Sequence, residues 1–333
     1  MVTIDDVARK AGVSASTVSY TLSRKRTISA ATRGRVERAI ADLGYHPHAG
    51  ARALASSRTN IIGLMVPLRA DVDVNVIMQF VAGVVTRART FDHDVLLLTQ
   101  EETAAVARVG SGSMVDALIL MDIEADDPRI PVVAALRQPT ILIGLPEDPQ
   151  GLSCVDFDFE AAARLSLRHL TSLGHRKVAL IGPPPAVLAR HTSYADRLLR
   201  GYRHQAEADG IANIVELSEA SHSGAVRALD AVLERLPDLT ALVVHNEAAL
   251  PSIVATLRQR GRRIPEDVSI VALCPADVAD AQPVPITSLD IPALTIGQVA
   301  VDMVMTRLNG SGTGETRLLT PTLHTRASTA PPS

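Results

Sequence analysis

Five hydroxyl side chains fall between positions 14 and 20 of the run GVSASTVSYTLS, which spans residues 12–23 and contains no charged side chain. Hydroxyl groups donate and accept hydrogen bonds, so they suit contacts to phosphate oxygens and to base edges. Arg24, Lys25 and Arg26 follow the run directly. The segment therefore has the chemistry of a nucleic-acid contact in which the flanks supply positive charge and the run itself discriminates.

One helix is predicted before this run and another after it. Thr3 is a good N-cap for the first, apolar residues follow at helical spacing, and Gly12 stands where the helix would end. A further helix is predicted to begin at Ser29 and to stop at Gly44, just before a His-Pro pair. These local signals predict the boundaries of both helices.

The hydroxyl run itself is predicted to be a helix with Ser14 as its N-cap. Val18 and Leu22 share one face of that helix, and Ser16 and Tyr20 share the opposite face. Two short helices joined by a tight turn and backed by a third are typical of a helix-turn-helix unit. The alternative is a three-helix packing module whose basic surface is merely solvated.

Charge is unevenly distributed along the 333 residues. Residues 1–60 contain ten basic and four acidic side chains, a net charge of +6, whereas the rest contains 23 basic and 32 acidic side chains, a net charge of −9. A basic head on an acidic body favours a polyanionic partner for the head alone, because the body repels nucleic acid. The charge pattern supports double-stranded DNA as the partner.

The remainder of the chain alternates short apolar runs with longer helical patterns, which is typical of parallel sheets with crossover helices. We expect two doubly wound α/β lobes joined near residues 155–162, with a cleft at the carboxyl ends of their strands. Strands are predicted at 60–66, 94–98, 116–121, 139–144, 177–182, 214–217, 241–246 and 268–273, and helices at 77–88, 161–173, 224–236 and 249–260.

The sequence beginning TIDDVARKAGVSASTVSYTLS and continuing to residue 67 resembles the LacI/GalR family of bacterial transcription regulators. The segments RHLTSLGHRKVALIG, RGYRHQAEADGI and RRIPEDVSIVAL resemble the effector-binding core of that family, which is similar to periplasmic sugar-binding proteins. The resemblance implies a homodimer on a near-palindromic operator. It also implies a discontinuous core, with the domains 1–47 (helix-turn-helix), 48–58 (hinge helix), 59–158 with 289–317 (amino-terminal lobe) and 159–288 with 318–333 (carboxy-terminal lobe).

The family pattern implies that Ala15, Ser16 and Tyr20 read bases, and that Leu54 of the hinge enters the minor groove. Many relatives have arginine where Tyr20 stands, so a different operator preference is expected here. The alternative for the hinge is a flexible linker. The predicted DNA-contacting residues are Thr3, Ser14, Ala15, Ser16, Thr17, Ser19, Tyr20, Arg24, Ser29, Thr32, Ala51, Leu54 and Ala55.

The resemblance also implies effector-binding residues at the strand ends of the cleft. Arg197 stands four residues before Gly201, where the family usually has a spacing of three, so Arg200 is a competing candidate. Asn246 matches a family asparagine, and the alternative for its stretch is a solvated loop end. The predicted effector-binding residues are Phe157, Tyr194, Arg197, Asn246, Glu247 and Cys274.

One of these positions departs from the family pattern. Cys274 stands where the family usually has a ligand-binding aspartate, and a thiol is a poor hydrogen-bonding group. Asp277 is a substitute if its loop bends inward, and Cys274 itself is expected to be a small buried residue rather than a redox sensor.

We therefore expect a transcription regulator, a repressor, whose operator binding responds to a small molecule, most simply a sugar. The alternative is a free solute-binding protein. An enzyme is not expected, because common catalytic motifs are absent at strand-to-helix turns. No cofactor, metal or membrane contact is expected. The amino terminus lacks a secretory pattern and the two cysteines lie far apart, which predicts a cytoplasmic location with reduced thiols.

Overall fold

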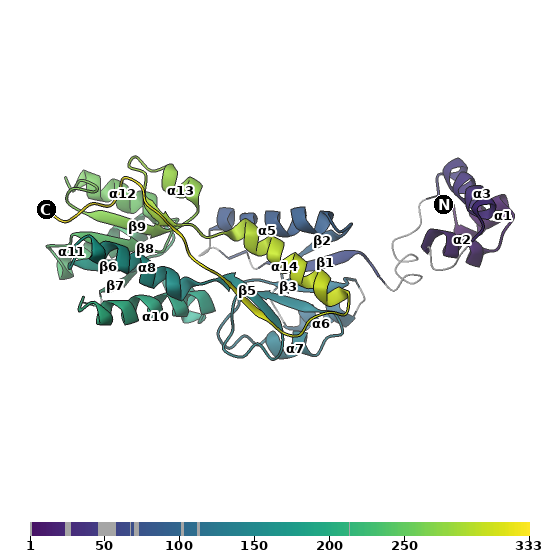
Figure 1. Ribbon diagram of the computed structural model, residues 1–333, viewed down its shortest axis with the longest axis horizontal. Helices are drawn as coiled ribbons and strands as arrows, with labels where there is room; N and C mark the ends of the chain where they lie inside the picture. The colour runs from purple at the N-terminus through teal and green to yellow at the C-terminus, as the bar shows by residue number, and fades with distance from the viewer. Residues whose placement is uncertain are drawn as a thin grey trace.

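The computed structural model describes residues 2–23, 28–45, 58–66, 68–69, 73–100, 103–111, 114–212 and 214–333. Figure 1 shows a small helical head and two larger lobes, through both of which the yellow carboxy-terminal part of the chain runs. Four predicted DNA-contacting residues, Arg24, Ala51, Leu54 and Ala55, lie outside the described residues. Within the described ranges, every helix is too short or too polar to cross a lipid bilayer.

The head contains the three predicted helices, α1 (Ile4–Ala11), α2 (Ala15–Ser23) and α3 (Ala30–Leu43). Thr3 and Asp6 form a capping box at the start of α1, and Gly12 ends that helix in the left-handed conformation. The Ser29 hydroxyl accepts from the backbone N–H of Thr32 at the start of α3. The small core of the head consists of Val7, Ala8, Ala11, Val18, Val36, Ala39 and Tyr45.

The first lobe is built on a six-stranded sheet in the order β11-β5-β4-β3-β1-β2, in which all neighbouring strands are parallel. Helices α5 and α14 cover one face, and α6 and α7 contribute to the core on the other. The bounds are β1 Ile61–Met65, α5 Val74–Arg89, β2 Asp94–Leu98, α6 Thr103–Ser111, β3 Ala117–Leu120, α7 Ile130–Ala134, β4 Thr140–Ile143, β5 Ser153–Phe157, α14 Ala293–Leu308 and β11 Thr316–Leu319.

The second lobe has a six-stranded sheet in the order β12-β10-β9-β8-β6-β7, parallel except for the β10–β12 pair. Alternate side chains of β6 enter different cores: Val178 and Leu180 face α8 and α10, while Ala179 and Ile181 face α11 and α12. The bounds are α8 Phe159–Ser172, β6 Val178–Gly182, α9 Pro185–Ala189, α10 Ser193–Ala208, β7 Val215–Leu217, α11 His222–Arg235, β8 Ala241–Val244, α12 Leu250–Gln259, β9 Ser269–Leu273, α13 Ala276–Asp280, β10 Thr287–Leu289 and β12 Leu323–His324.

The sheets confirm the predicted α/β fold class, and the eight predicted strands correspond to β1, β2, β3, β4, β6, β7, β8 and β9. The last two connections between the lobes lie slightly beyond the expected positions. Leu289 is the last residue of β10 in the second sheet, and β11 of the first sheet continues to Leu319. Both strands are short, so their ends depend on pairing with a neighbouring strand rather than on their own sequence.

Two glycines bring α5 and α14 into close contact. A Cβ on Gly83 would lie 2.1 Å from the carbonyl oxygen of Leu294, and a Cβ on Gly297 would lie 2.4 Å from that of Phe80. Only residues without a side chain allow this approach. The close packing fixes the position of Phe80, which lines the cavity between the lobes.

Candidate functional site

The exposed face of α2 presents the hydroxyl side chains predicted to contact DNA. Ser14, Ser16 and Tyr20 are exposed, and Tyr20 exposes 37% of its surface, whereas Val18 on the opposite side is fully buried. The Ser14 hydroxyl is 2.9 Å from those of Ser16 and Thr17 and also accepts from the backbone N–H of Thr17, so it caps the helix. The face is thus held in place by a buried anchor and an N-terminal cap.

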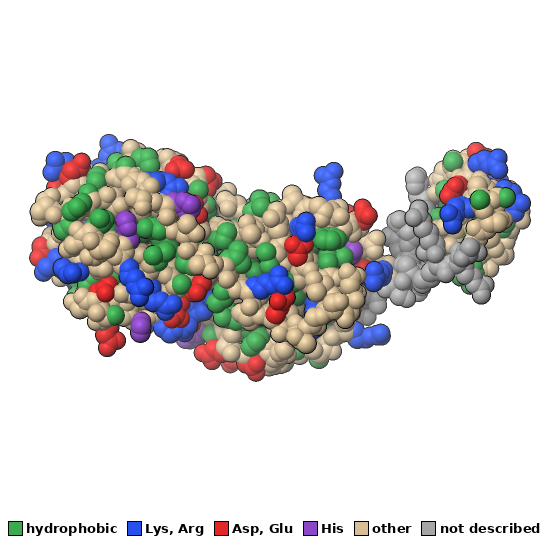
Figure 2. Space-filling view, viewed as in Figure 1, with side chains coloured by type: hydrophobic (Ala, Val, Ile, Leu, Met, Phe, Trp, Pro, Cys, Tyr) green, Lys and Arg blue, Asp and Glu red, His purple; other side chains and the backbone are tan. Residues whose placement is uncertain are grey.

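The other predicted DNA-contacting residues that the structure describes in the head range from half-buried to exposed. Ala15 is half-buried against the head core, and Thr17, Ser19 and Thr32 are half-buried. Thr3 is exposed and its hydroxyl is 2.7 Å from the Asp6 carboxylate, and exposed Ser29 donates to the Thr32 hydroxyl at 2.9 Å. Figure 2 shows Lys and Arg side chains beside a few acidic ones on the head, and a mixture of both signs of charge over the lobes.

A cavity of about 120 Å³ lies between the two lobes, at the carboxyl ends of strands from both sheets. This is where open α/β sheets place their ligands. Its lining comprises Val66, Val76, Ile77, Phe80, Met121, Asp122, Ile123, Ile143, Gly144 and Asp156 from the first lobe, and Phe159, Ser193, Tyr194, His245, Glu247 and Ile291 from the second lobe and the connections.

Three rings form a cluster on the second-lobe side of the cavity. Phe159 begins α8, Tyr194 lies in the first turn of α10, and His245 directly follows β8. The Phe159 and Tyr194 ring centroids are 5.1 Å apart, and the His245 ring lies 5.8 Å from Phe159 and 5.6 Å from Tyr194. The rings are inclined to one another, by 37° between Phe159 and Tyr194 and by 79° between Phe159 and His245, so each offers its own apolar surface to the C–H groups of a ligand.

His245 and Glu247 place polar atoms beside these rings. Burial lowers the pKa of His245 to about 4, so its imidazole is neutral near pH 7. Its buried Nδ1 atom has no hydrogen-bond partner. Burial also raises the pKa of Glu247 to about 7, against the effect of its own backbone N–H, and Asp73 at the start of α5 adds repulsion. Glu247 is half-buried because it faces the cavity.

An ion pair between Asp156 of β5 and Arg197 of α10 lies beside the cavity and joins the two lobes. The guanidinium of Arg197 donates to the Asp156 carboxylate and to the carbonyl oxygens of Phe157 and Ser193, the latter two at 3.3 Å. It also lies 5.7 Å from the centroid of the Phe159 ring. Arg197 is therefore a structural brace that supports several lining residues from behind.

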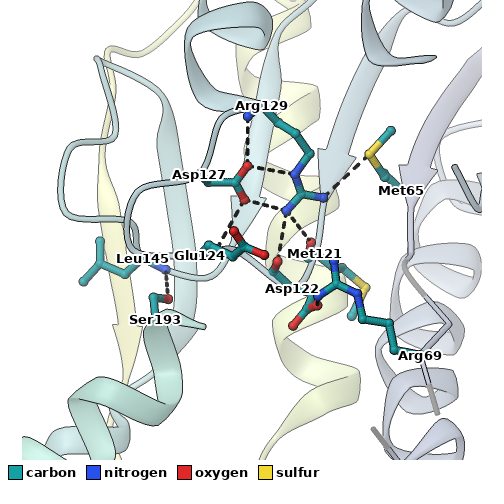
Figure 3. Close-up of polar contacts among 9 residues, drawn as sticks. All are labelled: Met65, Arg69, Met121, Asp122, Glu124, Asp127, Arg129, Leu145 and Ser193. Atoms are coloured by element: carbon teal, nitrogen blue, oxygen red, sulfur yellow. Dashed lines mark hydrogen bonds and ion pairs between the residues drawn. The ribbon is translucent and has the colours of Figure 1, made fainter. Parts of the chain in front are cut away.

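The loop after β3 is fixed by a second buried ion pair. Arg129 donates to both carboxylate oxygens of Asp127, at 2.9 and 2.6 Å, and to the carbonyl oxygens of Met121 and Asp122 (Figure 3). This pair holds Asp122 at the cavity, where its carboxylate accepts from Arg69 at 2.6 Å. The buried ion pair of Arg129 and Asp127 thus sets the position of Asp122, a charged residue of the cavity lining.

The same loop also contacts the second lobe directly. Glu124 and Thr192 form an isolated antiparallel bridge, in which the N–H of Ala125 donates to the carbonyl of His191 and the N–H of Ser193 donates to that of Ile123. Ile123 and Ser193 both line the cavity. A change in lobe separation would therefore alter the cavity wall and this bridge together.

The structure brings only some of the predicted effector-binding residues to the cavity surface. Tyr194 and Glu247 line it, while Phe157 is fully buried against Phe159. Asn246 is buried, donates to the carbonyl of Ser218 and accepts from the N–H of Ala249, so it fixes the loop rather than facing the cavity. Arg197 does not line the cavity itself, but it bonds to Asp156 and Ser193, which do.

The remaining candidates are not part of the cavity lining. Cys274 is fully buried in an apolar core, as expected of a small buried residue, and burial raises the pKa of its thiol. Arg200 is exposed and pairs with Glu160, and Asp277 is exposed on α13. Neither residue replaces the missing family aspartate in the lining.

Sequence reasoning overlooked five polar or aromatic lining residues, although all of them stand at or just beyond strand ends or helix starts. The rule that ligands bind beyond the carboxyl ends of parallel strands was the available signal, but it does not tell which side chains turn inward. These residues are Asp122, Asp156, Phe159, Ser193 and His245.

The raised pKa of Glu247 predicts a pH-dependent cost to stability. The unfolded chain, with an ordinary pKa near 4.5, releases this proton at lower pH than the native state does, so native stability falls as pH rises from about 4.5 to 7. Glu247→Gln removes the ionisation. We expect it to raise the free energy of unfolding by about 1–3 kcal/mol at pH 8 and by much less at pH 5.

Urea unfolding of the lobes at the two pH values measures this difference. Asp277→Asn is the matched control, since it removes a carboxylate from an exposed helix of the same lobe. An equal effect of Glu247→Gln at pH 5 and pH 8 would contradict the prediction.

Comparison with known proteins agrees with this architecture. A family model described as bacterial regulatory proteins, lacI family, matches residues 3–48, and a periplasmic binding protein-like domain matches residues 167–329. The HTH-type transcriptional regulator RafR of Escherichia coli is 30% identical over 323 residues, which cover 92% of this chain and 91% of the relative. The chain belongs to the LacI family of bacterial regulatory proteins. Its similarity to RafR extends through head and core alike.

Solved LacI-family structures share the whole fold. A Lac repressor dimer bound to operator and the anti-inducer ONPF has a TM-score of 0.85 and 26% identity, with 99% of each chain covered. A CelR–cellobiose complex has a TM-score of 0.70 and 27% identity, with 98% of this chain and 100% of the other covered. The alternative of a free solute-binding protein is wrong, because the full-length relatives are DNA-binding regulators.

Proposed function

We propose that this LacI-family regulator is a homodimeric repressor that binds a near-palindromic operator and whose operator affinity changes when a small sugar occupies the interlobe cavity. The observation that carries the proposal is the presence, in one chain, of an exposed hydroxyl face on α2 and a cavity between two lobes. The first element suits base and phosphate contacts, and the second suits a small ligand.

Some side chains of the head position the protein on the DNA backbone, and others recognise the bases. Ser14, Thr17 and Ser19 contact phosphates, and Ser16 and Tyr20 face base edges in the major groove. A second copy of the head in the dimer reads the other half-site one helical turn away. Leu54 of the hinge enters the minor groove between the two half-sites, where an apolar side chain kinks the duplex.

The contacts between the two lobes connect ligand binding in the cavity with operator binding by the head. Ile123 and Ser193 line the cavity and also form the backbone bridge between the lobes, so a ligand touching them favours one lobe arrangement over another. A ligand with different affinities for two arrangements shifts their populations. In the dimer, that shift changes how the first lobes present the hinges to DNA.

The ligand class is inferred from the lining and from a relative. The ring cluster with His245 and Glu247 suits a hydroxylated ring, and the CelR complex contains cellobiose. We further infer that the protein acts in the cytoplasm, where its DNA is, and that it is not an enzyme, as its relatives are regulators.

The decisive experiment selects operators from random double-stranded DNA with the full chain, and then measures release by a panel of sugars. We expect enrichment of a two-fold symmetric site, loss of binding when residues 1–58 are deleted, and a weaker complex as salt rises. If no sequence is enriched, or if the deleted chain binds the site equally well, the proposal fails.

A further inference from the structure

One carboxylate holds the chain at the point where it enters the first lobe. Asp116 directly precedes β3, and its Oδ1 atom accepts from the backbone N–H and the hydroxyl of Thr59, at 2.7 and 3.0 Å. Its Oδ2 atom accepts from the backbone N–H of Asn60 at 2.8 Å. Hydrogen bonds to an ionised acceptor are stronger than those between neutral groups. A single side chain therefore fixes two consecutive residues just before β1.

Backbone bonds attach the same residues to the neighbouring strands. The carbonyl of Asn60 accepts from the N–H of Asp94 at the start of β2, and the carbonyl of Ile61 accepts from the N–H of Asp116, both at 2.8 Å. Asn60 has a φ of 55°, in the left-handed region that residues with a side chain adopt only at a cost. The chain thus turns sharply before β1, and bonds from both sides hold it in that turn.

The turn after α5 covers this carboxylate. The Nε2 atom of His93 lies 4.0 Å from Oδ2 of Asp116, and the Nδ1 atom donates to the carbonyl of Phe91 at 2.7 Å. The side chains of His93 and Asp116 are only 7% and 8% exposed. Exclusion of water strengthens the bonds that Asp116 accepts. The helix that leads to this cover also lines the cavity, through Ile77 and Phe80.

We propose that Asp116 is a positioning residue for operator binding. Thr59 directly follows the predicted hinge, residues 48–58, so the bonds from Asp116 fix the direction in which the hinge leaves the first lobe. Any rearrangement of the lobes then carries the start of the hinge with it. Asp116 acts through this junction and not through a DNA contact of its own. The proposal rests on the proposed function, because it requires that the hinge and the head bind an operator.

The junction matters more for specific than for non-specific DNA binding. On an operator, two heads and two hinges must be placed together, and a loosened junction has to be ordered again at a cost in conformational entropy. Weak attachment of a head to phosphates is sequence-independent and needs no such arrangement. Loss of the Asp116 bonds should therefore weaken operator binding selectively.

Asp116→Asn is the sharpest test, because it keeps the volume of the side chain. The two carboxylate oxygens have different backbone partners, so the amide group in either orientation turns its NH₂ toward one N–H. The full-length variant is titrated at one salt concentration with the operator that the wild-type protein selects, and with an unrelated duplex of equal length. We expect the ratio of the two affinities to fall about 10- to 100-fold, a typical range for coupling between sites, while the unrelated duplex changes by less than about twofold.

The ratio distinguishes positioning from a general structural role, since a loss of folded protein lowers both affinities by the same factor. Asp94→Asn is the matched control. Asp94 is exposed beside the same junction, and the substitution removes the same charge while keeping the backbone bond to Asn60. Because exposed charges are screened by salt, this variant should keep the ratio within about twofold of wild type.

Thr59→Val is a second, milder variant that removes the hydroxyl bond to Asp116 and leaves the backbone bonds in place. It should lower the ratio in the same direction but less, and it decides the matter if Asp116→Asn does not fold.

The outcomes separate this inference from the proposed function. A wild-type ratio in Asp116→Asn, or an equal fall in Asp94→Asn, would overturn the inference and leave the repressor assignment intact. An unchanged ratio in Thr59→Val, where Asp116→Asn does not fold, would do the same. If the wild-type protein prefers no duplex over another, the proposed function fails and the inference fails with it.

Discussion

Arg197→Met will lower the free energy of unfolding of the lobes by about 3–5 kcal/mol, because it leaves the buried Asp156 carboxylate without its partner. The Arg197 side chain is 8% exposed and that of Asp156 is 7% exposed. Burial raises the pKa of the Asp156 carboxyl, while the charge of Arg197 opposes that shift. Without the guanidinium, the carboxylate must take up a proton or stay buried as an unpaired charge.

The same substitution also removes a bond between the lobes, to the carbonyl of Phe157, and a bond within α10, to the carbonyl of Ser193. Arg197 contacts the carbonyls of Phe157 in β5 and Ser193 in α10, and Ser193 lines the cavity. We therefore expect weaker effector binding in addition to lower stability. Urea unfolding followed by circular dichroism measures the stability change, and ligand titration measures the second effect.

Two further variants give this prediction its controls. Arg200→Met breaks a pair with Glu160 in which the arginine side chain is 60% exposed, so its cost should stay below about 1 kcal/mol. Combining Asp156→Leu with Arg197→Met removes both charges and should recover at least half of the loss. A single Arg197→Met protein as stable as the Arg200→Met protein would show that the buried pair contributes little.

Tyr20→Arg will change which operator the protein prefers. The Tyr20 side chain is exposed on α2 four residues after Ser16, so both point from the same face. A tyrosine contacts a thymine methyl with its ring and one base edge with its hydroxyl. An arginine instead binds guanine through two hydrogen bonds, which is worth about 1–3 kcal/mol of discrimination, or roughly 10- to 100-fold.

Operator selection with the variant and the wild-type protein, followed by binding measurements on both selected sites, tests this expectation. Leu22→Arg is the matched control, because Leu22 is 36% exposed but points from a different side of α2. It adds the same charge and should strengthen binding without altering the preferred sequence. An unchanged preference for Tyr20→Arg would remove Tyr20 from the base-reading residues.

The helices of the head were predictable because their signals are local. The Thr3 and Ser29 caps and the left-handed Gly12 and Gly44 each involve residues within one helical turn, and all four stand where they were expected. The alternation of strands and helices in the core was equally readable from apolar runs. Hydroxyl caps and fully apolar strands can be predicted from the local sequence, without knowledge of residues that are distant in the chain.

The strands that escaped prediction lack such a signal. Ser153 and Asp156 interrupt the apolar pattern of β5, and both are buried there only because neighbouring strands and Arg197 surround them. Residues 287–289 and 323–324 are too short to stand out, and they are strands because they pair with each other and, through β10, with β9. Pairing across long sequence separations is invisible to a local pattern.

By itself, the sequence determined the helix-turn-helix head, the two-lobed α/β class and the family resemblance. Only the tertiary structure decided which polar residues face the cavity and which are already paired. Asp156 and Arg197 stand 41 residues apart, and no local rule connects them. Whether a carboxylate faces the cavity, as that of Glu247 does, or is paired with a buried cation, as that of Asp156 is, depends on the charges and the burial that folding brings to it.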